Sequence, residues 1–181
     1  PQVAKVIANA AVQLCTGELR QVAQGQNWQL SETEYIDIIT EKSAILFSSA
    51  CYLGAISAQA RKAQTQALTE FGLNAGIAFQ ITDDLLDLVG DESKTGKRLG
   101  SDVNKHNLTL AVIHLLRSVD ETEKNVVINS YLKRKSAQYD RDALVKMLDR
   151  YGSLEYAHNR AQEFVATAIR ALSESGLKES R

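Results

Sequence analysis

Proline is almost absent from this chain, and its absence constrains the fold more than any other feature of the sequence. The one proline among the 181 residues stands at position 1. Proline breaks helices because its ring clashes with the preceding turn and it has no N–H to donate. The remainder of the chain is rich in Ala, Leu, Gln, Glu, Lys and Arg, which favour helices. We therefore expect an all-α fold.

Capping residues and glycines predict where the helices begin and end. A break is expected over residues 25–30, after which Ser31 and Glu34 form a capping box that opens a helix reaching about residue 59. A second long helix is expected over residues 61–89, before a loop that contains three glycines. The turn before the last helix is expected at Gly152. Three helices are expected near residues 106–118, 121–133 and 141–150, and the last helix is expected over residues 153–174.

Composition excludes several classes of protein. The chain carries 21 Lys and Arg against 22 Asp and Glu, a net charge of −1, which gives no reason to expect nucleic acid or an anionic membrane as a partner. No apolar run is long enough for an integral membrane segment. Cys15 and Cys51 lie in apolar helical surroundings, so we expect no disulfide and a cytoplasmic protein. A single domain is expected over residues 1–181.

Three aspartates near the end of the second long helix carry the strongest chemical signal. Phe79 and Gln80 precede Asp83, Asp84 and Asp87 in the pattern F-Q-x-x-D-D-x-x-D. At about 100° per residue, Gln80 and the three aspartates share one helical face, near a helix end where the dipole disfavours anions. The three like charges on this face repel one another, so a positive charge should lie near them. Clustered carboxylates suit Mg²⁺. A solvated acidic face is the alternative, but the surrounding apolar residues favour a lined cavity.

Two basic positions complete the set of candidate residues. Lys42 opens an apolar helical run, where a lone lysine more often extends its ammonium group to solvent than binds an anion. Lys97 and Arg98 lie between the glycines of the loop 96–102, an arrangement that can close over a phosphate. The stretch from Asp91 to Asp102 also resembles a calcium-binding EF-hand loop, but its carboxylates are too few. The three histidines lack the spacing of metal ligands, which favours surface or capping roles.

Short motifs follow one another in a definite order along the chain. They are Gly17-Glu18-Leu19 with Gln21, Lys42-Ser43-Ala44, Gly54-Ala55, Gly76 to Ile81 leading into Asp83-Asp84 and Asp87, Gly96-Lys97, Gly100, Asp102, Thr109-Leu110, and residues 151–157. In this order the motifs resemble those of the trans-isoprenyl diphosphate synthase family, the polyprenyl synthetases. The resemblance implies an all-α helical bundle of the isoprenoid (terpenoid) synthase type.

The resemblance also implies an activity. Members are trans-prenyltransferases of polyprenyl or geranylgeranyl type. In these enzymes Mg²⁺ bound to aspartates helps an allylic diphosphate to ionise. The resulting allylic cation then alkylates isopentenyl diphosphate. Asp83, Asp84 and Asp87 match the family's second aspartate-rich motif, with Asp83 as the principal metal ligand. The family habit further implies a homodimer.

Four basic and polar positions acquire roles from the same resemblance. Lys42 and Lys97 would hold the diphosphate of the allylic substrate, together with Gln80. The carbonyl of Lys42, the hydroxyl of Ser43 and the amide oxygen of Gln80 would stabilise the developing cation. Apolar helix faces would exclude water from it.

Departures from the family pattern limit these expectations. The family's first aspartate-rich motif should precede Gly17, but residues 1–16 contain nothing like it. We therefore expect this chain to be the C-terminal portion of a polyprenyl synthetase domain, without its N-terminal helices, and to be inactive alone. Asn107 replaces a usual lysine and Ala111 a usual proline. These departures leave open a non-catalytic partner subunit of a prenyl diphosphate synthase. A terpene cyclase is less favoured, because it would lack the arrangement of Lys42 and Lys97.

Overall fold

The computed structural model describes residues 2–25, 27–90, 107–129 and 141–176. Every regular element in these ranges is a helix, so the predicted all-α fold is confirmed. The chain divides into two compact units, of which unit 1 contains Pro1–Arg20, Ile36–Gln80 and Arg160–Arg181, and unit 2 contains Gln21–Tyr35 and Ile81–Asn159. The single domain expected over residues 1–181 stays a prediction.

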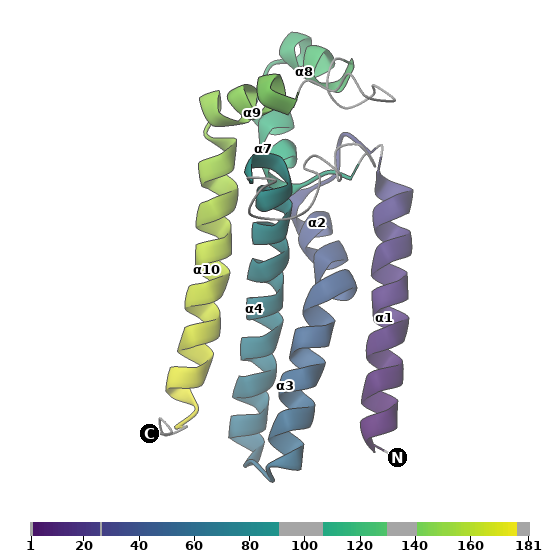
Figure 1. Ribbon diagram of the computed structural model, residues 1–181, viewed down its shortest axis with the longest axis vertical. Coiled ribbons are helices and arrows are strands. Elements are labelled where there is room, and N and C mark those ends of the chain that lie inside the picture. The colour runs from purple at the N-terminus through teal and green to yellow at the C-terminus, as the bar shows by residue number, and fades with distance from the viewer. Residues whose placement is uncertain (1, 26, 91–106, 130–140, 177–181) are drawn as a thin grey trace. The chain divides into compact units, whose positions relative to one another are not determined.

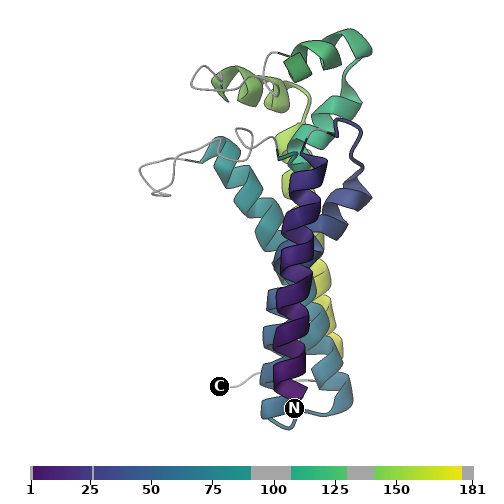
Figure 2. The same cartoon turned by 90° about the vertical axis from the view of Figure 1, so that its right-hand side faces the viewer.

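Unit 1 consists mainly of long helices that run side by side (Figures 1 and 2). They are α1 (Gln2–Gln24), α3 (Ile45–Ser57), most of α4 (Lys62–Val89) and the second part of α10 (Ser153–Glu174). The helix predicted over residues 61–89 is thereby confirmed. No helix in the described part of the chain is both long and apolar enough to cross a membrane.

Small residues let α3 approach α4 closely. A Cβ atom added to Gly72 would lie 2.6 Å from the carbonyl oxygen of Phe47, and one added to Gly76 would lie 2.6 Å from the Cα of Ala44. Real Cβ atoms do not approach backbone atoms this closely, so the two helices can pack at this distance only where α4 has no side chain. The glycines of α4 therefore fix the position of the helix that carries Ala44 and Phe47.

The helix predicted from the capping box contains an unexpected π-helical turn. Ser31 and Glu34 form the box as predicted, with the Glu34 N–H donating to Ser31 Oγ (3.1 Å) and the Ser31 N–H donating to Glu34 Oε2 (2.8 Å). The helix continues as α2 (Glu32–Ile39), passes through the π-helix Thr40–Ala44 and becomes α3. A π-helical turn inserts one extra residue per turn, which periodicity alone does not reveal.

Unit 2 contains the shorter helices α7 (Leu110–Ser118), α8 (Glu121–Val127) and α9 (Arg141–Arg150). The largest fully buried side chains of these three helices are aliphatic: Leu110, Val112, Leu115, Val127, Leu144 and Leu148. Gly152 has φ +64°, so the turn predicted there is confirmed. The helix predicted near residue 106 begins at Leu110, because Thr109 is extended, with φ −88° and ψ 162°.

One histidine of unit 2 has a different role from the one predicted. His114 is partly buried, its Nδ1 lies 2.9 Å from Ser153 Oγ, and its ring stacks on Tyr156 with centroids 4.2 Å apart. The Tyr156 hydroxyl donates to Glu32. His114 thus belongs to a polar network that joins α7, α10 and α2, and burial lowers its pKa below the usual value, partly opposed by the charge of Glu32.

Candidate functional site

The π-helical turn of unit 1 carries Lys42 and Ser43, two of the residues predicted for the site. The side chain of Lys42 is only 19% exposed, and its Nζ lies 3.8 Å from Glu18 Oε1 on α1. A second pair joins the same elements, with Arg20 Nη1 2.6 Å from Glu41 Oε1. Lys42 therefore stays close to the protein surface instead of extending freely into solvent. π-Helical turns are frequent at functional sites.

The backbone of this turn is held by a very close approach of α1. A Cβ atom added to Gly17 would lie 2.4 Å from the Lys42 nitrogen and 2.8 Å from the Lys42 Cα. Only glycine fits there, because the obstruction is backbone and cannot move aside. Gly17 belongs to the first motif of the sequence, and the structure supplies the physical reason for a glycine at that position.

Ser43 and Gln80 meet in unit 1 although 37 positions separate them in sequence. The Ser43 hydroxyl donates to Gln80 Oε1 at 2.5 Å, and Gln80 is 7% exposed. The hydrogen bond orients the buried amide, because a carbonyl oxygen that accepts from Ser43 leaves the NH₂ group on the other side. This pair supplies a fixed dipole beside Lys42.

Two aromatic side chains lie next to these residues in sequence and form a pair. The ring centroids of Phe47 and Phe79 are 5.2 Å apart, with the planes tilted by 41°. Phe79 is 54% exposed and Phe47 38%, so both present apolar surface in this chain. The sequence marked Phe79 only as a neighbour of the aspartates and did not predict the pairing, which depends on the close packing of α3 against Gly76.

The three aspartates belong to unit 2, in the last turns of α4. Asp84 is 5% exposed and accepts a hydrogen bond of 2.7 Å from the hydroxyl of Tyr35, which is itself buried. Asp83 and Asp87 are partly exposed and stand four positions apart on the same helix. The described residues contain no preformed group of three or more His, Cys, Asp or Glu side chains that could hold a metal ion.

The donor set nevertheless fits Mg²⁺. This ion prefers oxygen ligands, keeps several waters, and is commonly held by one or two carboxylates plus substrate phosphates. Asp83 and Asp87, one helical turn apart, offer two such carboxylates, whereas the carboxylate of Asp84 is buried against Tyr35. The metal-binding roles of all three aspartates stay predictions.

The positive charge that the sequence required near the aspartates comes partly from Arg141 at the start of α9. Its Nε donates to the carbonyl of Leu88 at 2.7 Å, and its Nη2 donates to the carbonyl of Gly90 at 3.1 Å. These carbonyls form the negative end of the α4 dipole, so the guanidinium offsets the dipole at the helix end that carries the aspartates. Sequence reasoning missed Arg141 because its partner lies 53 positions away.

Other predicted residues are placed differently or lie outside the described ranges. Lys97 and its loop, including the candidate EF-hand positions, are outside the described residues. Asn107 is described and partly buried. Tyr35 is an additional residue beside the aspartates, and no local signal in the sequence distinguishes it from other helix residues. Glu18, the partner of Lys42, belongs to the first motif of the sequence.

Solved structures of known proteins share this fold. Geranylgeranyl pyrophosphate synthetase from Pyrococcus horikoshii has a TM-score of 0.86 and 34% identity over 99% of this chain and 54% of its own. A polyprenyl synthase from Caulobacter crescentus, complexed with calcium and isoprenyl diphosphate, has a TM-score of 0.89 and 28% identity over 96% of this chain and 53% of its own. The fold is thus the helical bundle of the isoprenoid synthases, as the sequence predicted.

The sequence comparisons identify the family. The family model for polyprenyl synthetase matches residues 1–148, and the chain belongs to that family. Geranylgeranyl diphosphate synthase from Sulfolobus acidocaldarius is 35% identical over 149 residues, which are 82% of this chain and 45% of that protein. The chain spans about half the length of the relatives that it matches.

Proposed function

We propose that the protein containing this chain is a trans-prenyltransferase that condenses an allylic diphosphate with isopentenyl diphosphate. The C–O bond of the allylic substrate breaks and its electron pair leaves with the diphosphate. The allylic cation forms a C–C bond with isopentenyl diphosphate, and loss of a proton completes the longer diphosphate. The observation that carries this proposal is the pair of partly exposed carboxylates, Asp83 and Asp87, beside the buried Asp84 in a chain of this family.

Each candidate residue has a task in this proposal. Asp83 and Asp87 would hold Mg²⁺, which when bound neutralises charge on the leaving diphosphate. Lys42 and Lys97 would hold the diphosphate of the allylic substrate through their positive charges. The complex of the Caulobacter relative with calcium and isoprenyl diphosphate supports a divalent cation and a diphosphate as partners.

The uncharged residues would protect and orient the cation. The Ser43 hydroxyl holds the Gln80 amide in one orientation, so its dipole needs no reorganisation when charge develops. The carbonyl of Lys42 adds another dipole. Phe47 and Phe79 offer aromatic surface that excludes water and attracts a cation.

We further propose a homodimer in the cytoplasm. Support for the dimer comes from α1, which exposes aliphatic side chains that an interface would cover: Val3, Ile7, Val12, Leu19 and Val22. Size-exclusion chromatography with light scattering measures the assembly directly. The alternative of a non-catalytic partner subunit is not favoured, because the similar proteins are named as synthases.

Calorimetry of geranyl diphosphate binding, with and without Mg²⁺, tests the proposed site. We expect geranyl diphosphate to bind only with Mg²⁺, and Asp83→Asn to weaken this binding by about 30-fold, because a carboxylate ligand of the metal ion is lost. Asp149→Asn removes an equal charge from an exposed position on α9 and should leave the affinity unchanged. Equal effects of both substitutions, or binding that does not require Mg²⁺, would contradict the proposal.

A further inference from the structure

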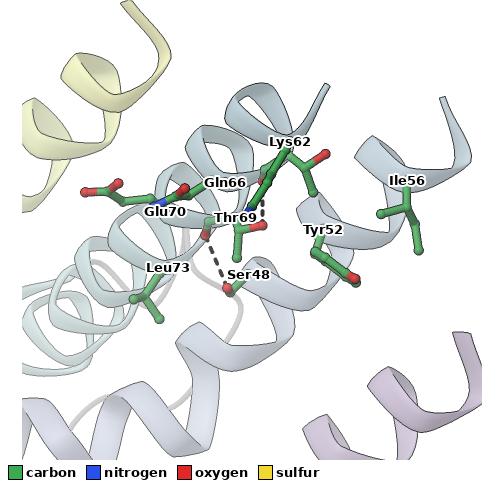
Figure 3. A pocket seen from close by; sticks show the side chains of 9 residues that line it. Ser48, Tyr52, Ile56, Lys62, Gln66, Thr69, Glu70 and Leu73 are labelled. Carbon is green, nitrogen blue, oxygen red and sulfur yellow. Dashed lines mark hydrogen bonds between the residues drawn. The ribbon is translucent and has the colours of Figure 1, made fainter. Parts of the chain in front are cut away.

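Side chains of neighbouring helices donate hydrogen bonds to backbone carbonyls both in the middle and at the end of α4. In the middle, Ser48 Oγ donates to the carbonyl of Thr69 at 3.2 Å (Figure 3). At the C-terminal end, Arg141 donates to the carbonyls of Leu88 and Gly90, at 2.7 and 3.1 Å. A carbonyl inside a helix already accepts from the residue four positions on, whereas the last four carbonyls have no such donor. Arg141 therefore supplies hydrogen bonds that α4 cannot make by itself.

The end of α4 depends on these hydrogen bonds because part of it is buried. Leu88 is 0% exposed, so its carbonyl cannot bond to water instead. The guanidinium is planar and donates through two nitrogens, which fixes the two carbonyls relative to each other as well as pairing them. The Gly90 N–H closes the same turn by donating to the carbonyl of Leu86 at 2.8 Å. Residues 86–90 therefore form one turn that Arg141 holds in place.

Asp87 belongs to this turn, and Asp83 precedes it. Asp87 is the residue directly before Leu88, whereas Asp83 lies one turn earlier. Without the two hydrogen bonds the end of the helix frays, because its last carbonyls lose their partners and the free energy of local opening falls. Fraying displaces the side chain of Asp87 and leaves that of Asp83 in place. Arg141 is therefore suited to fix the two carboxylates relative to each other.

We propose that Arg141 is a positioning residue for metal-dependent binding, which acts on Asp87 through the backbone of α4. This role rests on the proposed function, in which Asp83 and Asp87 hold Mg²⁺, whereas the hydrogen bonds of Arg141 do not. The charge of Arg141 has the opposite effect, since a cation near the site repels Mg²⁺. The sign of the effect of a substitution therefore separates positioning from charge.

Hydrogen exchange followed by NMR in EDTA tests the hold of Arg141 on α4 without a metal ion. In Arg141→Gln the amide of Gly90 should exchange at least about tenfold faster, because the turn opens more often. Amides in the middle of α4, such as that of Leu73, should exchange as in the parent protein. Unchanged exchange at Gly90 overturns the proposal. Equal acceleration at both amides also overturns it, because it shows a general loss of stability.

Calorimetry of geranyl diphosphate binding over a series of Mg²⁺ concentrations tests the effect on the site. Arg141→Gln should raise the Mg²⁺ concentration at half-maximal binding by about fivefold, somewhat less than the loss of a group that directly supports a metal ligand. Arg141→Lys keeps the charge without the planar fork and should still raise it by about threefold. Lys146→Gln, at an exposed position on the same helix, is the matched control and should change nothing. An unchanged or lower Mg²⁺ requirement in Arg141→Gln, or a parent-like Arg141→Lys, overturns the proposal.

A double-mutant cycle identifies the aspartate through which Arg141 acts. With Asp87→Asn already present, Arg141→Gln should change the Mg²⁺ requirement by less than about twofold, because the carboxylate that it positions is gone. With Asp83→Asn present instead, the effect of about fivefold should remain. Equal effects in both backgrounds overturn the route through Asp87.

The two proposals fail separately. A parent protein that binds geranyl diphosphate without any need for Mg²⁺ contradicts the proposed function and with it the role of Arg141 at the site, and exchange at Gly90 then still shows whether Arg141 holds the end of α4. Mg²⁺-dependent binding that Asp83→Asn weakens and Arg141→Gln leaves unchanged supports the proposed function and overturns the role of Arg141.

Discussion

The residues around Lys42 and the aspartates of α4 are held in place by different means. Lys42 and Ser43 sit on a π-helical turn whose backbone touches Gly17, and Ser43 is bonded to a buried Gln80. Among the aspartates, Asp84 alone is buried and bonded to Tyr35. Packing therefore orients the Lys42 backbone and the Gln80 amide before any ligand binds. The carboxylates of Asp83 and Asp87, by contrast, are partly exposed and accessible to a cation.

The largest effect is expected where α1 touches the π-helical turn. Gly17→Ala should lower the free energy of unfolding by about 3 kcal/mol, because the added methyl group collides with the Lys42 backbone and forces α1 away. Urea denaturation followed by circular dichroism measures this change.

Gly54→Ala is the matched control for that substitution. Gly54 also lies inside a helix, but a Cβ atom there would meet nothing within 4 Å. Alanine should stabilise the helix by about 0.5–1 kcal/mol through its better helix propensity. If both glycine substitutions change stability alike, close packing does not hold the Lys42 turn.

The next effect distinguishes Asp84 from its neighbours. Tyr35→Phe should lower the free energy of unfolding by about 2 kcal/mol, because a buried carboxylate loses a hydrogen-bond donor. Asp83→Asn should change stability much less, since its side chain is partly exposed, and should act on Mg²⁺-dependent binding instead. Thermal melts of both variants, with binding measured in parallel, make the comparison. A large loss of stability in Asp83→Asn would break the distinction drawn between these aspartates.

A smaller effect on stability is expected at the hydrogen bond between Ser43 and Gln80. Ser43→Ala should lower the free energy of unfolding by about 1 kcal/mol, because Gln80 Oε1 is left buried without this donor. Ser43→Thr keeps a hydroxyl and should restore most of the stability. Equal stability of the alanine and threonine variants would show that the hydrogen bond contributes nothing.

The smallest effect is expected from the titration of His114. Burial lowers its pKa below the usual 6.5, so the folded state favours the neutral ring. Its contribution to stability is therefore complete above pH 6.5 and is lost as the pH falls through the lowered pKa. The melting temperature should fall less on acidification in His114→Gln than in the parent protein. The exposed His158→Gln should behave like the parent, and a parent-like acid response in His114→Gln would contradict the assignment.

The sequence by itself determined the fold class, the family and most helix boundaries. Absence of internal proline, the capping box at Ser31 and the turn at Gly152 are local signals, and local backbone preferences act through neighbours in the chain. The ordered series of motifs identified the family, and the spacing within the motif around Asp83 is a property of one helix.

Only the tertiary structure decided how those residues are used. The bond of Tyr35 to Asp84, the bond of Ser43 to Gln80 and the cap of Arg141 on α4 join residues that are far apart in the chain. The π-helical turn at Lys42 and its contact with Gly17 likewise depend on how α1 packs. Such contacts follow from packing in three dimensions, which no local pattern encodes, and so four similar acidic and polar positions on α4 acquire different roles.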